Sequence, residues 1–147
     1  MRTLVALLLA GSAVAQAPPN KPQPYENLKH ENLKQVMRSV PLPNSDIIFG
    51  VQSKLPRNDM EWQTVENAAI AIEETANLIL LPGRMQSNGK PVPVQAADFV
   101  KYARALGPAG RDCLKAAQKK SQDLISYCTD GLSQACDNCH NAYRDKT

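Results

Sequence analysis

The fold is decided by residues 58–83, which read NDMEWQTVENAAIAIEETANLILLPG. Apolar side chains recur along this segment at alternating steps of three and four, which is the spacing of the buried face of a helix in a left-handed bundle. They are Trp62, Val65, Ala69, Ile72, Ala76 and Ile79. Asn58 is a good N-cap residue, and Glu61 three residues later predicts a capping box. Pro82 and Gly83 predict the end of this helix.

A broken helix is expected before this segment. Apolar residues recur at helical spacing from about Tyr25, but Pro41 and Pro43 interrupt them. Proline has no N–H to donate and clashes with the preceding turn, so it ends or kinks a helix. The helical pattern then resumes as far as Val51. We therefore predict one kinked or broken helix here.

Two further helices are expected after it. One runs from about Gln95 to Lys119, with a candidate kink at Gly107-Pro108, and the other begins after the N-cap residue Ser121. No stretch of any length has the alternating pattern of a strand. Because the connections between the helices are short or moderate, we predict an all-α fold, an up-down-up-down four-helix bundle.

The N-terminal residues predict export. Residues 1–15 have the features of a signal peptide, namely Arg2, a short apolar run and a small-residue cleavage site at Ala13-Val14-Ala15. The apolar run is too short to span a bilayer stably, so no membrane span is expected in the mature chain. Residues 16–24 predict a proline-rich linker, and residues 25–147 a single bundle domain. The expected location is the periplasm.

The charge and its distribution along the chain do not indicate a nucleic-acid partner. The 147 residues contain 17 Lys and Arg and 14 Asp and Glu, a formal net charge of +3. No basic stretch is interleaved with aromatic residues, so nucleic-acid binding is not indicated.

The most specific motif lies in the fourth helix and reads Cys136-Asp137-Asn138-Cys139-His140. Two cysteines two residues apart, followed directly by histidine, form the c-type haem attachment pattern. On a helix Cys136, Cys139 and His140 stand at i, i+3 and i+4, so they project from one face. The thiols can form thioethers with the two vinyl groups of one haem, and His140 can bind the iron as proximal ligand.

Two other interpretations of the motif, a dithiol redox pair and a zinc site, fit the sequence less well. A dithiol redox pair is typical of a βαβ context, which this sequence lacks. A zinc site would need further ligands, and the remaining candidates, Cys113, Cys128 and His30, have spacings unlike those of a zinc finger.

Cys113 and Cys128 lie on either side of the expected turn at Lys120-Ser121. In an antiparallel helical hairpin these two positions face each other. A disulfide between the two helices and a pair of free buried thiols are both consistent with this placement.

With the haem motif near the C-terminal end of a four-helix bundle, the chain resembles the cytochrome c-prime family and its low-spin relatives. The resemblance extends from about Tyr25 to Arg144, and Tyr143-Arg144 matches the aromatic-basic pair that follows the motif in that family. It implies that Arg144 lies beside the haem on its proximal side, as a cofactor-binding residue. It also implies that the first two helices could form a homodimer.

The resemblance also suggests a sixth iron ligand. Low-spin relatives use a methionine on the first helix, and Met37 matches that position. Thioether ligation stabilises ferrous iron and so raises the reduction potential. Two alternatives stay open: Met37 is a packing residue of the core, or His30, seven residues earlier on the same face, is the ligand.

The sequence therefore predicts an exported electron carrier rather than an enzyme. Its covalently attached haem c would have its iron bound by His140 and Met37, and it would exchange electrons with transient redox protein partners. The alternative is a five-coordinate haem protein that binds NO or CO in an apolar distal pocket. A peroxidase would need a distal base, for which the first helix offers only His30.

Overall fold

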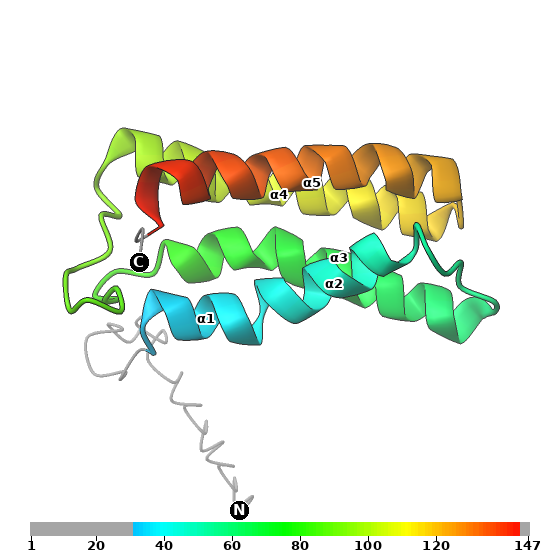
Figure 1. Ribbon diagram of the computed structural model, residues 1–147, viewed down its shortest axis with the longest axis horizontal. Helices are drawn as coiled ribbons and strands as arrows, with labels where there is room; N and C mark the ends of the chain where they lie inside the picture. Colours follow the sequence, from blue (N-terminus) through cyan, green and yellow to red (C-terminus); the bar gives the residue numbers. More distant parts are fainter. Residues whose placement is uncertain (1–30, 145–147) are drawn as a thin grey trace, which may run out of the picture.

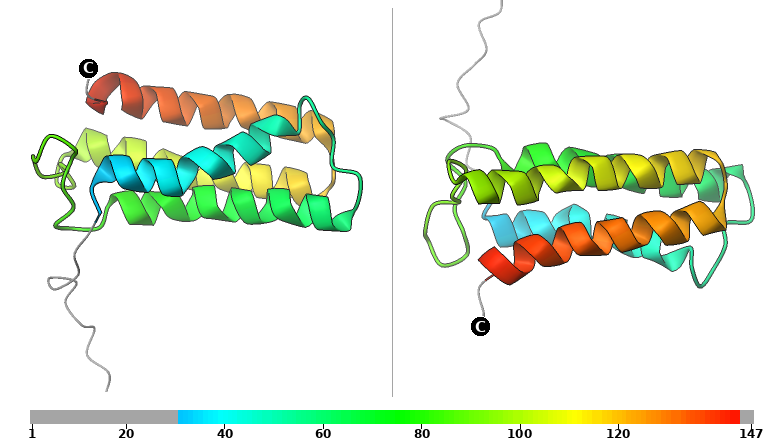
Figure 2. Two further views of the ribbon diagram at one scale, coloured as in Figure 1. Left: turned by 60° about the horizontal axis from the view of Figure 1, so that its bottom comes forward. Right: turned by 90° about the horizontal axis from the view of Figure 1, so that it is seen from above.

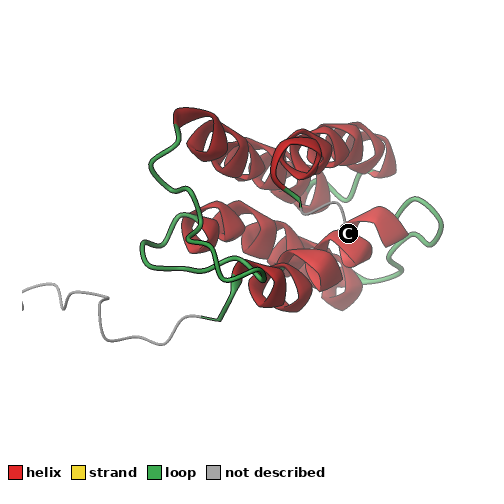
Figure 3. Ribbon diagram, turned by 60° about the vertical axis from the view of Figure 1, so that its left-hand side comes forward, coloured by secondary structure: helices red, strands yellow, loops and turns green. Residues whose placement is uncertain are grey.

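The computed structural model describes residues 31–144, so the predicted signal peptide, the proline-rich linker, Tyr25 and His30 lie outside the described residues. Five helical segments make up the described chain: α1 (Leu33–Ser39), α2 (Pro41–Gly50), α3 (Asp59–Ile79), α4 (Ala97–Gln118) and α5 (Gln122–Tyr143). Within residues 31–144 no strand is present (Figure 3). The one β-type pairing there is an isolated bridge between Met85 and Pro91.

These segments form four antiparallel rods, because α1 and α2 follow one another as a single broken rod (Figure 1). α3 packs on α2 and α4, and α4 packs on α5. The chain runs up, down, up and down, which confirms the predicted all-α four-helix bundle. The start of α1, the end of α5 and the connection between α3 and α4 all lie at the same end of the bundle (Figure 2).

The first rod breaks at Val40, as predicted. Val40 donates its N–H to the Val36 carbonyl oxygen at 3.0 Å and so ends α1. Pro41 then occupies the first turn of α2, where the missing N–H costs no helical hydrogen bond. The Asn44 side-chain amide donates to the Val40 carbonyl oxygen at 2.7 Å. The two prolines therefore restart the helix rather than end it.

The N-terminus of α3 is capped, but only half of the expected capping box forms. The Asn58 side chain accepts from the Glu61 N–H at 2.9 Å. The Glu61 carboxylate accepts instead from the Arg57 N–H at 2.8 Å and from its guanidinium at 2.7 Å. Charge-assisted bonds of this kind are stronger than a neutral one, which explains why Glu61 bonds to Arg57 and not to the Asn58 N–H.

α4 and α5 begin close to the expected residues. α4 runs without interruption through Gly107-Pro108, and Ser121 caps α5 by accepting from the Leu124 N–H at 3.3 Å. Many buried positions between the helices are alanine: Ala68, Ala69, Ala76, Ala103, Ala116, Ala117 and Ala135. Small side chains let the helices approach closely.

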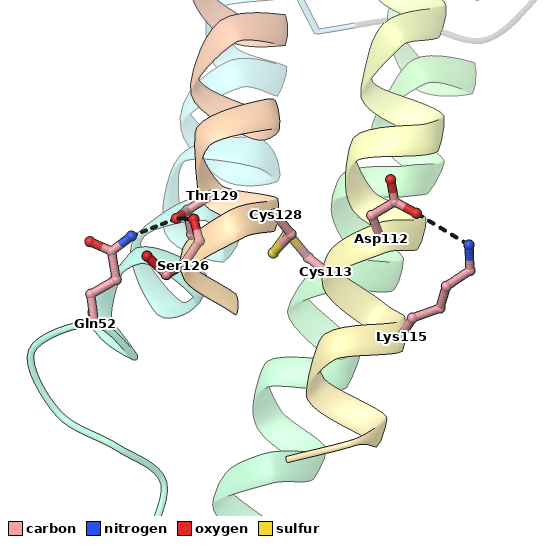
Figure 4. Close-up of a disulfide and its surroundings, with 7 residues drawn as sticks. All are labelled: Gln52, Asp112, Cys113, Lys115, Ser126, Cys128 and Thr129. Carbon is pink, nitrogen blue, oxygen red and sulfur yellow. Dashed lines mark hydrogen bonds and ion pairs between the residues drawn. A yellow bond between two sulfur atoms is a disulfide. The ribbon is translucent and has the colours of Figure 1, made fainter. Parts of the chain in front are cut away.

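Cys113 and Cys128 form a disulfide between α4 and α5, with their Cα atoms 5.2 Å apart (Figure 4). Of the two alternatives that the sequence left open, the disulfide is the one observed. Next to it the Gln52 side chain of the segment after α2 donates to the buried Thr129 hydroxyl. No helix among residues 31–144 is both long enough and apolar enough to cross a membrane.

Candidate haem-attachment site

Cys136, Cys139 and His140 lie on the last two turns of α5, on one helical face, as expected from their spacing. Both cysteines are free thiols. They are partly buried and pack against the hydrophobic core, whereas His140 is exposed. The helix thus presents two thiols and an imidazole together, with the thiols on the apolar side.

The environment of the thiols keeps them protonated at neutral pH. Burial is the largest cause that raises the pKa of Cys136, and the neighbouring Asp137 carboxylate adds to it. Burial, and then Cys136, raises the pKa of Cys139. Reactive dithiols in oxidoreductases have the opposite shift, which a helix N-terminus or a nearby cation produces. Here the pair lies at a helix C-terminus.

The His140 imidazole tends toward its neutral form. Desolvation by the surrounding protein is the first cause that lowers its pKa, and the positive charge of Arg144 is the second, while Asp137 opposes both. Neutral imidazole is the form that binds a metal ion. Arg144 follows α5 directly and donates its N–H to the His140 carbonyl oxygen at 3.0 Å. The basic residue is therefore an electrostatic neighbour of the histidine.

The last turn of α5 packs against helix α4 through Tyr143. The Tyr143 ring packs edge-on against Phe99, with centroids 5.0 Å apart, and against Tyr102 at 6.2 Å. The Tyr143 hydroxyl donates a hydrogen bond to the Asp98 carboxylate, which lowers the pKa of Asp98 and raises the pKa of Tyr143 to about 12. The turn that carries Cys139 and His140 is thus held against α4.

The contact between Asp98 and Tyr143 was not predicted from the sequence, although the spacing of these residues indicates it. Asp98 lies 15 residues before Cys113, and Tyr143 lies 15 residues after Cys128. In an antiparallel hairpin the register that pairs the two cysteines therefore also pairs Asp98 with Tyr143.

The candidate distal ligand lies on another helix at the same end of the bundle. Met37 of α1 is partly buried and packs against the core. α1 packs on α2 and α3, and it is not among the helices that pack closely on α5 within the described residues. Met37 and His140 thus come from two helices that lie apart (Figure 2).

The disulfide bears on the alternative of a zinc site. Because Cys113 and Cys128 are bonded to each other, neither is available as a thiolate ligand. In the part of the chain from residue 31 to residue 144, no three His, Cys, Asp or Glu side chains are grouped around a common metal position.

The chain matches no protein-family model, and no curated protein or solved structure matches it. The class of the molecule is therefore defined by its own fold and site: an all-α bundle with a Cys-x-x-Cys-His turn at the end of its last helix.

Proposed function

We propose that this chain is an exported c-type cytochrome that acts as an electron carrier. Cys136 and Cys139 bind the haem covalently, and His140 is the proximal iron ligand. The observation that carries this proposal is the turn of α5 that presents two free, half-buried thiols and an imidazole on one face. Bound there, the iron would exchange single electrons between its ferric and ferrous states.

The residues of the site fit such a group. Partial burial of the thiols on the apolar side of α5 suits attachment of a flat apolar macrocycle, and the lowered pKa of His140 favours the ligating form. The raised thiol pKa values and the helix C-terminus argue against a dithiol oxidoreductase. The Cys-x-x-Cys-His motif and the bundle together resemble the cytochrome c-prime family, and Arg144 would then lie beside the haem.

The proposal extends to location and partners. Residues 1–15 would direct the chain to the periplasm, where c-type haem is attached and where the Cys113–Cys128 disulfide is stable. The partners would be redox proteins that bind transiently. No reaction on a bound substrate is proposed.

Intact-mass spectrometry of the exported protein tests the attachment. We expect the mass of one haem to be added to the chain after residues 1–15 have been removed. Replacing both Cys136 and Cys139 with alanine should abolish that addition. The matched control replaces Cys113 and Cys128 with alanine, which removes the same number of cysteines and should leave the haem in place. A wild-type protein without added haem mass would refute the proposal.

Met37 is proposed as the sixth ligand, which distinguishes an electron carrier from a gas-binding protein. The wild-type protein should show low-spin absorption bands with a methionine-to-iron charge-transfer feature. Met37→Ala should convert the spectrum to high-spin, lower the reduction potential and allow NO to bind. Met85→Ala is the control, since Met85 is exposed in the connection between α3 and α4. A wild-type spectrum that is already high-spin would favour the five-coordinate alternative that binds NO or CO.

A further inference from the structure

Arg84, in the connection between α3 and α4, is the one buried charged side chain among residues 31–144, with 5% of its surface exposed. Burying a charge is costly unless it is paired and hydrogen-bonded, and arginine is almost never fully buried without a partner. The surroundings of this guanidinium therefore need an explanation.

The partners that Arg84 has are main-chain oxygens. Its Nε donates to the Leu78 carbonyl oxygen at 3.2 Å, in the last turn of α3, and its Nη1 donates to the Glu31 carbonyl oxygen at 2.5 Å, just before α1. The next residue, Met85, accepts from the Leu33 N–H of α1 at 2.8 Å. Arg84 thus lies between the end of α3 and the start of α1, the helix that carries Met37.

Within the described residues these contacts leave the positive charge of Arg84 without a full counter-charge. Within residues 31–144 no carboxylate forms an ion pair with Arg84. The C-terminus of α3 contributes only about half a negative charge through its helix dipole. Arginine has five N–H donors, and the two bonds above use two of them. Among residues 31–144 only these two acceptors bond to the guanidinium, which leaves donors for an external carboxylate.

The location of Arg84 points to the source of that carboxylate. The connection between α3 and α4 lies at the same end of the bundle as the Cys136–His140 turn (Figures 1 and 2). A haem has two propionates at the edge away from the vinyl groups through which the thiols would hold it. A planar guanidinium matches a carboxylate with two parallel hydrogen bonds.

We infer that Arg84 binds a propionate carboxylate of the haem and supplies its counter-charge. This inference rests on the proposed function. It makes Arg84 a positioning residue for the cofactor, on the opposite side of the bundle from the covalent attachment to α5.

The test compares holoprotein variants by resonance Raman spectroscopy of the propionate bending band and by potentiometric titration across pH. Arg84→Gln should shift that band, lower the reduction potential and make the potential more dependent on pH, because the propionate loses its counter-charge. Arg84→Lys keeps the charge but not the planar fork, so it should shift the band while changing the potential less. Lysine at this position also serves if Arg84→Gln does not fold.

Arg38→Gln is the matched control, since Arg38 is an exposed arginine on α1 at the same end of the bundle. It should leave the propionate band unchanged. If both Arg84 variants lower the denaturation midpoint but leave the band and the potential as in wild type, Arg84 is only a clamp between α3 and α1, and the inference is overturned. A wild-type protein without haem overturns the proposed function and this inference together.

Discussion

At the scale of single residues, the contact between Asp98 and Tyr143 makes stability depend on pH in a defined direction. The hydrogen bond from Tyr143 is the first cause that lowers the pKa of Asp98, so its contribution is present above the unfolded pKa of about 3.9 and is lost as pH falls through the folded value. The pKa of Tyr143 is raised to about 12, so its contribution is complete below about pH 10 and is lost as pH rises toward 12.

Because each group shifts the pKa of the other, Asp98→Asn and Tyr143→Phe should both flatten the acid side and the alkaline side of the stability profile. Thermal unfolding midpoints between about pH 2 and pH 12 measure this effect. Asp137→Asn is the control, because Asp137 is an exposed carboxylate on α5 whose removal should leave the Asp98–Tyr143 contact intact. An acid limb that Asp98→Asn leaves unchanged would contradict the assignment.

The same scale shows what the sequence can predict about the site. Cys136, Cys139 and His140 were found because helix geometry alone brings i, i+3 and i+4 together. Arg84 was not found as a buried charge, because its burial depends on where the chain returns after α3 to meet α1. The spacing of residues within one helix predicts the turn with Cys136, Cys139 and His140. It does not predict which residues from other parts of the chain lie near that turn, because these come together only through tertiary packing.

At the scale of helices, α3 and α4 approach each other closely at Gly110. A Cβ atom at this position would lie 2.5 Å from the Glu73 nitrogen and 2.9 Å from the Ala69 carbonyl oxygen. Both are main-chain atoms, so α3 and α4 would have to move apart to make room for an added Cβ atom. Gly110→Ala should lower the free energy of unfolding by about 1–3 kcal/mol, measured by denaturant titration.

Gly131→Ala in α5 is the matched control, since nothing beyond the adjacent backbone of its own helix lies within 4 Å of its Cβ position. Alanine favours a helix over glycine by roughly 0.5–1 kcal/mol, so this variant should be neutral or stabilising. If Gly110→Ala were as stable as Gly131→Ala, α3 and α4 would not be packed at this separation.

The helix ends show which features of the sequence predict a boundary reliably and which do not. The break at Val40 follows from covalent properties of proline and was predicted. The capping box at Asn58 was predicted from spacing. The Glu61 carboxylate instead accepts hydrogen bonds from Arg57, because its bond with the positively charged guanidinium is stronger than one with a neutral N–H. The prediction that rests on the chemistry of proline alone is confirmed. The prediction of the capping box, in which Glu61 has two possible hydrogen-bond partners, is confirmed only in part.

At the scale of the whole molecule, two cross-links join α4 and α5 in one register. The Cys113–Cys128 disulfide lies near the turn between the helices, and the Asp98–Tyr143 contact lies at the other end, beside the attachment turn. They are separated by 15 residues along each helix, which is about 22 Å. The hairpin of α4 and α5 is therefore held at both ends.

Removing the disulfide by replacing Cys113 and Cys128 with alanine should lower the free energy of unfolding by about 3 kcal/mol, since the bond closes a loop of about 15 residues. Because the cross-links are far apart and share no partner, combining this change with Asp98→Asn should give the sum of the separate losses to within roughly 0.5 kcal/mol. Denaturant titrations of the two parents and the combined variant at pH 7 measure that sum. A combined loss that departs from the sum by well over 1 kcal/mol would mean that the cross-links are coupled, so that a change at the disulfide end would reach the turn that carries His140.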